Sequence, residues 1–225
     1  MCDRVSPSSL SLIALDGPSG VGKSTTAKRV ALELGWNYLD TGAMFRATAL
    51  ALKRSGMSLQ DGARLQSLLD GLRIEQRGTR IFLDGEDVSE TIRNTDITRM
   101  VSSVSADPRV RQVLLAQQRA IGSRGAWVVD GRDIGTVIFP EACCKIFLTA
   151  SVEARARRRF LELRAKGNAT LLEDVTEDIQ RRDHQDTTRA LAPLMKAPDA
   201  TELDSSHMSL EEVVAWIVAH HRAHP

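Results

Sequence analysis

The feature that most constrains the fold of this chain is a glycine-rich loop near its start. Residues 10–15 read LSLIAL, an apolar run typical of a buried strand, and residues 17–24 read GPSGVGKS. The second segment matches G-x-x-x-x-G-K-[ST], a phosphate-binding loop, and Ala27, Val30 and Leu34 follow it at helical spacing. Because strand, loop and helix occur in the required order, we expect backbone N–H groups and a helix N-terminus to bind a nucleoside triphosphate there.

Two side chains of this loop carry the expected chemistry. Lys23 is expected to reach the β- and γ-phosphates, and the hydroxyl of Ser24 to ligate Mg²⁺. We expect the Lys23 side chain to face solvent and to contribute little to packing. The other loop residues expected at the triphosphate are Gly17, Pro18, Ser19, Gly20, Val21, Gly22 and Thr25.

Short apolar segments alternate with helical patterns along the rest of the chain. This alternation favours an α/β fold, in which a parallel sheet carries helices on both faces. A final helix is expected after Ser209, because Ser209 and Glu212 form a capping box. Earlier helices are expected at 25–34, 43–54 and 151–165. The five strands of the sheet are expected at 10–15, 37–40, 127–129, 145–148 and 201–203.

One stretch interrupts the alternation. Its strand candidates are residues 72–75, 80–83 and 86–88. Gly78 and the pair Asp84 and Gly85 lie between them and favour tight turns. Parallel strands need crossovers of about a dozen residues or more, so strands this close must pair antiparallel. We therefore expect a small antiparallel insertion at about 70–93, packed on the core.

Composition excludes several classes of protein. Thirty Lys and Arg residues against 29 Asp and Glu leave a formal net charge of +1, which argues against a general nucleic-acid or membrane-surface binder. No apolar run approaches the roughly 20 residues that span a bilayer, and residues 1–9 lack the pattern of a secretory signal. The cysteines, Cys2, Cys143 and Cys144, predict no disulfide framework and a reducing, cytoplasmic setting. Because no long apolar heptad pattern occurs, we expect a monomer.

A GTPase would share the phosphate-binding loop. GTPases of this kind carry D-x-x-G and [NT]-K-x-D after the loop. In this chain no Asp is followed three residues later by Gly, and neither N-K-x-D nor T-K-x-D occurs. A GTPase is therefore excluded.

Arginine-bearing loops follow two of the expected strands. Arg46 lies after the strand at 37–40, and Arg132 and Asp133 follow the strand at 127–129. Because the carboxyl ends of parallel strands meet at one edge of a sheet, we expect these side chains to face the crevice that holds the phosphate-binding loop. For the segment 130–136 the alternative is a polar surface turn.

Two further arginine groups occur at helical spacing. Arg155, Arg158 and Arg159 are expected on one face of the helix at 151–165, and the alternative is a solvated helix face. The second group could hold a sugar and a phosphate, or could form a surface ion-pair ladder that contributes little stability. It consists of Arg182, Asp186 and Arg189, spaced i, i+4 and i+7.

Together these motifs resemble one family. The segments that carry the resemblance are GPSGVGKS (17–24), DTGAMFR (40–46), VSSVSADPRVR (101–111), DGRDIGTVIFP (130–140), EARARRR (153–159) and RRDHQDTTRALAPL (181–194). Their order and spacing are similar to those of bacterial cytidylate kinase, over nearly the whole chain. The phosphate-binding loop is shared by many folds, whereas DGRDxGTVxFP and RDxxDxxRAxxPL are far more particular to this family.

The resemblance implies a division of the chain. A P-loop kinase core would comprise 9–40 and 106–225, with a helical lid at about 153–170. A nucleoside-monophosphate-binding domain would comprise 41–105 and contain the antiparallel insertion. The implied activity is transfer of the γ-phosphoryl group of ATP to CMP or dCMP, with Mg²⁺ as cofactor and with no nucleic-acid or membrane partner.

The resemblance also assigns residues to three groups. The ATP-binding group would comprise the loop residues 17–25 and the lid arginines Arg155, Arg158 and Arg159. The catalytic group would be Lys23, Arg132, Arg158 and Arg189. The CMP-binding group would be Thr41, Arg46, Ser102, Arg111, Arg132, Asp133, Arg182, Asp186 and Arg189.

Within the CMP-binding group, each part of the nucleotide would have its own contacts. The phosphate would be bound by Arg46 and Arg132, the cytosine by Ser102, Arg111 and Asp133, and the pentose by Arg182 and Asp186. Arg189 would lie near the acceptor. Thr41 stands where many members of the family have Ser, so a hydroxyl is kept beside an added methyl group.

Two alternatives remain open at this point. Another P-loop small-molecule or nucleoside monophosphate kinase, for UMP or thymidylate, would share the core but should lack the set formed by the DGRD segment, Ser102 and Arg111. A nucleotide sensor without catalytic activity would keep the phosphate-binding loop but would not need so many arginines on the acceptor side. A phosphate monoester has a second pKa of about 6, so a monophosphate acceptor is mostly anionic at neutral pH and requires no general base.

Overall fold

The fold is taken from a computed structural model, which describes residues 10–165 and 167–223. Residues 1–9, where we expected no secretory signal and which include Cys2, lie outside the described residues. Cys143 and Cys144 carry free thiols. Within the described part of the chain, no helix is long and apolar enough to cross a membrane.

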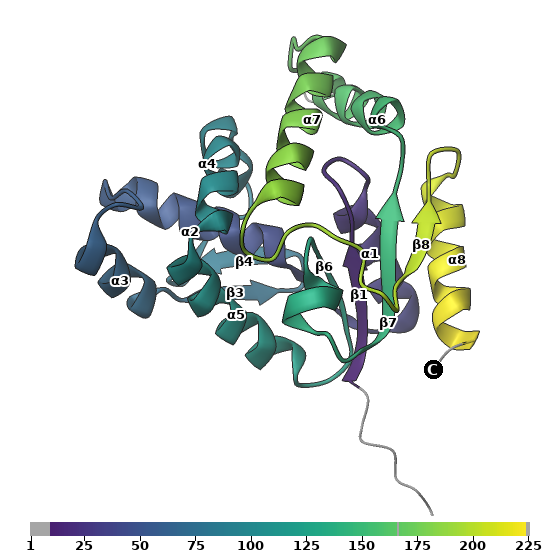
Figure 1. Ribbon diagram of the computed structural model, residues 1–225, viewed down its shortest axis with the longest axis horizontal. Helices are drawn as coiled ribbons and strands as arrows, with labels where there is room; N and C mark the ends of the chain where they lie inside the picture. Colours follow the sequence, from purple (N-terminus) through teal and green to yellow (C-terminus); the bar gives the residue numbers. More distant parts are fainter. Residues whose placement is uncertain (1–9, 166, 224–225) are drawn as a thin grey trace, which may run out of the picture.

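Five parallel strands form the central sheet and confirm the predicted architecture. Their spatial order is β2-β6-β1-β7-β8, and every neighbouring pair is parallel. Strands β6, β1, β7 and β8 are labelled in Figure 1. The strand from the middle of the chain, β6, thus lies between the first two strands. The bounds are β1 Leu10–Asp16, β2 Asn37–Asp40, β6 Trp127–Gly131, β7 Ala142–Thr149 and β8 Thr201–Asp204.

Both faces of this sheet are buried, which explains the apolar run at 10–15. On β1, Leu12 and Ala14 join one core cluster, whereas Ile13 and Leu15 join the other. A strand covered on both sides reads as continuously apolar rather than alternating. The covering helices are α1 (Lys23–Leu34) and α8 (Leu210–Ala223) on one face, and α2 (Thr41–Ser55) and α5 (Pro108–Gly122) on the other.

The predicted antiparallel insertion is also present. Its strands pair in the order β3-β4-β5. The turn residues Asp84 and Gly85 adopt left-handed backbone, with φ of 50° and 86°, as a tight hairpin turn requires. The bounds are β3 Ile74–Arg77, β4 Arg80–Leu83 and β5 Glu86–Asp87.

Gln76 attaches this insertion to the main sheet. Its side-chain amide donates to the carbonyl of Tyr38 at 2.7 Å, and its side-chain oxygen accepts from the N–H of Asp40 at 2.9 Å. Both partners are backbone groups on the outer edge of β2. The insertion therefore closes the edge of the sheet immediately before the segment that carries Arg46.

The sequence patterns did not place several helices. These are α3 (Gly62–Gly71), the short turn Thr91–Arg93, α4 (Thr95–Ala106), α5, the π-helical turn Ile134–Ile138 and α7 (Leu172–Thr188). The start of α5 had a readable signal. The Asp107 carboxylate accepts from the N–H groups of Arg109 and Val110, and Pro108 occupies the first helical position.

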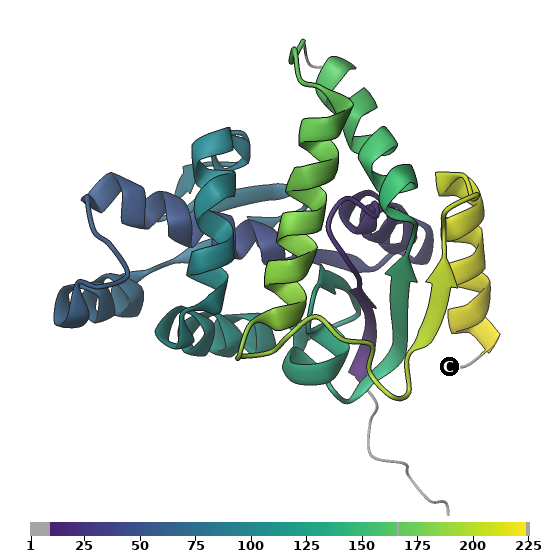
Figure 2. The same cartoon turned by 45° about the horizontal axis from the view of Figure 1, so that its top comes forward.

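Two helices project from the carboxyl edge of the sheet as a pair. Helices α6 (Val152–Ala165) and α7 lie side by side, and α7 lies between α6 and α4 (Figure 2). Part of their contact is apolar, since Ala156 of α6 packs with Val175 and Ile179 of α7. At the other end of the chain, the predicted capping box is confirmed, with Ser209 and Glu212 exchanging hydrogen bonds of 2.8 and 3.2 Å at the start of α8.

Candidate active site

The phosphate-binding loop joins β1 to α1 at the carboxyl edge of the sheet. Gly17 passes so close to β7 that an added Cβ would lie 2.0 Å from the carbonyl oxygen of Leu148. Gly22, the residue before α1, has a φ of 99°, which side-chain-bearing residues rarely adopt. The loop therefore requires glycine at these positions for two different reasons, close approach and left-handed backbone.

Lys23 does not face solvent, so that expectation is wrong. It is the first residue of α1 and is only 6% exposed, because the loop wraps around it. Its Nζ donates to the carbonyl oxygens of Gly17 and Pro18, both at 2.7 Å. Burial lowers the pKa of Lys23 well below its usual range, and the nearby charge of Arg132 acts in the same direction. The loop thus holds a cation at the place where phosphate is expected.

Asp130, which the sequence reasoning did not assign, accepts a hydrogen bond from Ser24. The Ser24 hydroxyl donates to Asp130 Oδ2 at 2.8 Å, and the Tyr38 hydroxyl donates to Oδ1 at 2.8 Å. Burial raises the pKa of Asp130 to about 6, and repulsion from Asp40 adds to the effect. Its position at the end of a strand beside β1 was the available signal.

Asp16, the residue before the loop, is a second unassigned buried acid. Its two carboxylate oxygens accept from the N–H groups of Ile134 and Gly135, each at 2.8 Å. Burial raises the pKa of Asp16 to about 6, against the lowering effect of these two hydrogen bonds. Asp16 therefore fastens the π-helical turn after β6 to the end of β1.

These two carboxyls predict a particular pH dependence of stability. The pKa of Asp16 and of Asp130 is about 6 in the folded chain, against an ordinary value of 3.8 for an aspartic acid side chain exposed to water. Between these values the folded chain binds more protons than the unfolded chain, so the free energy of unfolding falls as pH rises. We expect it to be lower at pH 7 than at pH 5 by about 1 kcal/mol for each carboxyl.

Urea unfolding of the nucleotide-free protein at pH 5 and pH 7 measures this difference. An Asp130→Asn variant removes one of the two titrating groups and should show about half of the change. A protein that is more stable at pH 7 than at pH 5 would contradict the prediction.

Arginines from three elements come together on the side where the resemblance predicts the phosphoryl acceptor, and they are called the acceptor-side cluster below. Arg46 comes from α2, Arg132 follows β6 and Arg182 lies on α7. Burial lowers the pKa of Arg182, and the positive charges of Arg132 and Arg46 lower it further, so the three cations are close enough to repel one another. Two carboxylates partly balance them, with Asp40 3.2 Å from Arg46 and Asp186 2.7 Å from Arg132. Such a concentration of half-buried positive charge suits a bound anion.

Asp133 lies at the centre of a second charged group. It is 3% exposed and forms an ion pair with Arg111, and Arg189 Nη2 lies 3.4 Å from its Oδ1. Burial raises the pKa of Asp133, while the charges of Arg111 and Arg189 oppose that rise. Arg111 also donates to the carbonyl of Ser105 at 3.0 Å, which ties this group to the end of α4. Ser102 lies half-buried on α4, one turn before Ser105.

The alternative of a polar surface turn is therefore wrong for Asp133, and the alternative of a surface ion-pair ladder is wrong for Asp186 and Arg189. Asp133 and the side chain of Arg189 are almost fully buried, and Asp186 pairs with Arg132 from another element. Thr41 has a local role in the same region. Its hydroxyl donates to the carbonyl of Asp130 at 2.7 Å and so joins the start of α2 to the end of β6.

The three arginines of α6 do not converge on one site in this structure. Arg155 is buried and contacts the carbonyl of Ser19, whereas Arg158 donates to the carbonyls of Ser205 and Met208 in the segment before α8. Arg159 is exposed and pairs with Glu162, its neighbour on the helix, at 3.0 Å. Only Arg159 thus fits the solvated helix face. Arg155 contacts the phosphate-binding loop itself, and no pattern of residue spacing in the sequence indicated this contact.

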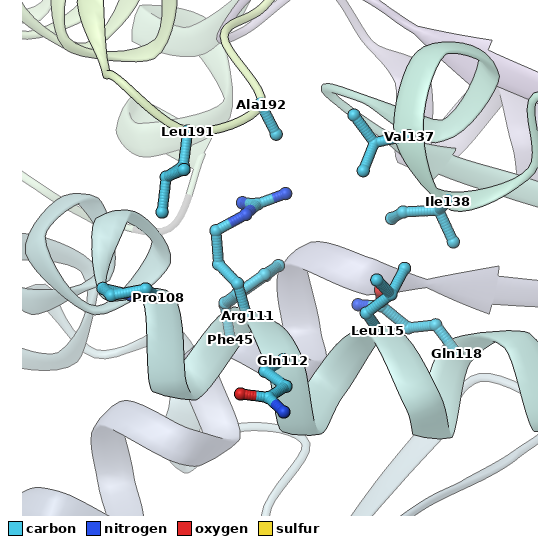
Figure 3. Close-up of a pocket in the computed structure, with 10 residues that line it drawn as sticks. All are labelled: Phe45, Pro108, Arg111, Gln112, Leu115, Gln118, Val137, Ile138, Leu191 and Ala192. Carbon is cyan, nitrogen blue, oxygen red and sulfur yellow. The ribbon is translucent and has the colours of Figure 1, made fainter.

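A cavity of about 290 Å³ opens beside Arg111 (Figure 3). Its wall is mostly apolar and includes Phe45, Leu115, Val137 and Leu191, and the Arg111 guanidinium extends among them. The Arg111 guanidinium carbon lies 5.7 Å from the centre of the Phe45 ring. The Arg111–Asp133 pair therefore borders an apolar recess.

The fold and the sequence of this chain are similar to those of known kinases. A gluconokinase structure from Sinorhizobium meliloti 1021 is 15% identical, with a TM-score of 0.51 and coverage of 96% of this chain and 94% of that chain, and it shows a shared fold. The cytidylate kinase of Geobacter sp. (strain M21) is 47% identical over 207 residues, which cover 90% of this chain and 89% of that protein. The cytidylate kinase of Caldanaerobacter subterraneus subsp. tengcongensis is 48% identical over 202 residues, 90% of each protein.

A family model described as cytidylate kinase matches residues 13–223, and this match includes the phosphate-binding loop and all the charged groups described above. Because the family model and the curated relatives both span about nine-tenths of the chain or more, this chain belongs to the cytidylate kinase family.

Proposed function

We propose that this protein transfers the γ-phosphoryl group of ATP to CMP or dCMP, giving ADP and the nucleoside diphosphate. The observation that carries this proposal is the central place of Arg132. Its charge acts on Lys23 of the phosphate-binding loop and on Arg182 of the acceptor-side cluster. Arg132 follows β6, the strand beside β1, and pairs at 2.7 Å with Asp186 of α7, the helix that also carries Arg182. One guanidinium is thus near both a loop suited to a triphosphate and a second group of cations suited to an anion, as transfer between two phosphates requires.

The chemistry needed at this place is mainly electrostatic. Donor and acceptor are both polyanions, and the acceptor phosphate is largely ionised at neutral pH, so no general base is required. The side chains that we propose to act on the transferring group, by neutralising charge as it moves from one oxygen to the other, are Lys23, Arg132, Arg189 and, after closure of the lid, Arg158. Arg46 and Arg132 would bind the CMP phosphate, since both project into the acceptor-side cluster.

The residues at the loop also suit a magnesium ion. Ser24 Oγ and Asp130 Oδ2 are hard oxygen ligands that lie 2.8 Å apart beside the loop. The described residues include no group of three or more His, Cys, Asp or Glu side chains able to hold a metal ion, so an ion here would share its coordination with phosphates and water. When bound, Mg²⁺ would supply positive charge to the phosphate oxygens.

The base and sugar would be bound by the remaining charged groups. The Asp133 carboxylate can accept from the exocyclic amine of cytosine, whereas uracil presents an acceptor at that position. Arg111 and Arg189 would hold the carboxylate in place, and Ser102 would complete the contact to the base. Arg182 and Asp186 would contact the pentose hydroxyls.

The proposed contacts of Arg158 and Arg159 with ATP require a change in the position of α6. Arg158 holds two carbonyl groups before α8, and Arg159 points to solvent. A lid that closes over the nucleotide would release Arg158 from Ser205 and Met208. Closure of this kind excludes water, which would otherwise accept the phosphoryl group.

A panel of acceptors tests the proposed function. The rate of ADP formation from ATP is measured in the presence of Mg²⁺, with CMP, dCMP, UMP, AMP or dTMP as the acceptor. We expect CMP and dCMP to give the highest kcat/KM, with UMP poorer. Equal or better turnover of AMP or dTMP would identify a different monophosphate kinase, and ATP binding without turnover of any acceptor would identify a nucleotide sensor.

A further inference from the structure

Both main-chain polar groups of Ser19, in the middle of the phosphate-binding loop, are held by one ion pair. The N–H of Ser19 donates to Asp183 Oδ1 at 2.8 Å, and its carbonyl accepts from Arg155 Nη1 at 2.8 Å. The same Arg155 nitrogen lies 2.5 Å from Asp183 Oδ2. Arg155 belongs to α6 and Asp183 to α7. Both projecting helices therefore bind the backbone of the loop at Ser19.

Within this contact the Arg155 side chain is buried and closely packed, whereas Asp183 is half-buried. Arg155 is 5% exposed, and its Nε donates to the carbonyl of Ala150 at 3.0 Å. A Cβ added to Gly20 would meet the Cδ1 atom of Ile179 at 3.2 Å and the Cβ atom of Arg155 at 3.6 Å. Ile179 precedes Asp183 by one helical turn, so both lie on the face of α7 that meets the loop. All the Arg155 contacts described here are internal to the protein.

The next turn of α7 contacts the acceptor side. Asp186, three residues after Asp183, pairs with Arg132 at 2.7 Å. One stretch of rigid helix thus binds the donor loop at Asp183 and the acceptor-side arginine at Asp186. The distance between the two phosphate sites is set in part by this stretch, and in-line transfer depends on that distance.

We infer that Asp183 is a positioning residue for phosphoryl transfer, which acts with Arg155 by holding the Ser19 backbone and by fixing the phosphate-binding loop relative to Arg132. This inference rests on the proposed function for its reaction, but the contacts themselves do not depend on which monophosphate is the acceptor. Asp183 touches the loop backbone and need not touch a substrate. Loss of its carboxylate leaves the Ser19 N–H and the buried Arg155 guanidinium without this partner.

The test compares Asp183→Ala and Asp183→Asn with Glu177→Ala, which removes an exposed carboxylate from the same helix. For Asp183→Ala we expect kcat to fall at least tenfold and KM for ATP to rise more than KM for CMP, because the loop binds ATP. Asp183→Asn keeps an acceptor for the Ser19 N–H and should recover part of the loss. Glu177→Ala should behave as wild type. Activities are expressed per folded molecule, from circular dichroism at the assay temperature.

ATP binding by isothermal titration calorimetry provides a second readout that needs no acceptor. We expect Asp183→Ala to bind ATP at least tenfold more weakly than wild type. Inactivity of the wild-type protein on CMP would refute the proposed function, while the ATP affinities would still test Asp183. If Asp183→Ala is too unstable to assay, Asp183→Asn alone decides by the same two measurements. Changes of less than threefold in both kcat and ATP affinity would overturn the inference.

Discussion

The variant Lys23→Ala is expected to lose nearly all phosphoryl transfer, with kcat reduced by a factor of about 10² to 10³. Lys23 is a buried cation held inside the phosphate-binding loop, where it donates to two loop carbonyls. In the proposed reaction its ammonium group would leave these carbonyls for the β- and γ-phosphates. Because that charge matters most as the phosphoryl group transfers, kcat should fall more than ATP binding weakens.

The same variant is expected to remain folded. Burial already disfavours the charged form of Lys23, which is why its pKa is lowered, and the hydrogen bonds lost are to carbonyls of its own loop. The free energy of unfolding should therefore change by less than about 2 kcal/mol. Arg29→Ala, which removes an exposed charge from the same helix, is the matched control and should keep wild-type activity. Retention of more than a tenth of the wild-type kcat in Lys23→Ala would refute the assigned role.

Removal of the Asp133 carboxylate is expected to relax the choice of base. In Asp133→Asn the amide can donate to the uracil oxygen as well as accept from the cytosine amine. We expect the ratio of kcat/KM for CMP to that for UMP to fall at least tenfold, since a buried charged hydrogen bond is worth about 1.5–3 kcal/mol. Steady-state kinetics with both acceptors measures the ratio.

Asp133→Ala provides the companion measurement. It should lower the same ratio, but it also leaves Arg111 and Arg189 without their shared carboxylate, so it should be less stable than Asp133→Asn. Asp96→Asn changes an exposed carboxylate on α4 and should alter neither the ratio nor the stability appreciably. An unchanged ratio in both Asp133 variants would place base selection elsewhere, with Arg111 the next residue to test.

Much of the architecture could be predicted because its signals are local. The glycines of the loop after β1 and the turn residues Asp84 and Gly85 need backbone conformations that few other residues adopt. The capping box at Ser209 satisfies backbone groups within one helical turn. Helices α3 and α4 were not predicted from these local signals. Helix α5 was not predicted either, although Asp107 and Pro108 mark its start.

The acceptor side could also be predicted, for a topological reason. Parallel strands end at one edge of a sheet, so Arg46, Arg132 and Asp133 had to lie near the phosphate-binding loop once the strands were identified. The residues on α7 could be placed there only through the family resemblance, because helical spacing alone also fitted a surface ion-pair ladder. Burial of Asp186 and Arg189 settled that alternative.

Only the tertiary structure decided which acidic residues support the loop. Asp130 meets Ser24 across 106 positions of sequence, Asp16 meets Ile134 across 118, and Asp183 meets Ser19 across 164. The strand ends at Asp16 and Asp130 indicate that these two carboxylates lie at the edge of the sheet, but not which groups they contact, and nothing near Asp183 in sequence indicates its partner. The order of strands places β6 beside β1, and the packing of α7 on the loop brings in Asp183.

The same distinction explains why the surroundings of Lys23 and Arg155 differed from expectation. Helical spacing and loop motifs specify the direction in which Lys23 and Arg155 leave the backbone, but not what covers them. Burial raises the energy of an isolated charge steeply, so each cation takes whichever oxygens the fold places within reach. For Lys23 and Arg155 these are loop carbonyls and, for Arg155, one carboxylate of α7. The sequence thus determined on which strands, loops and helices the candidate site residues lie. Long-range packing decided which groups they contact, because the partners of a buried charge come from segments far apart in the chain.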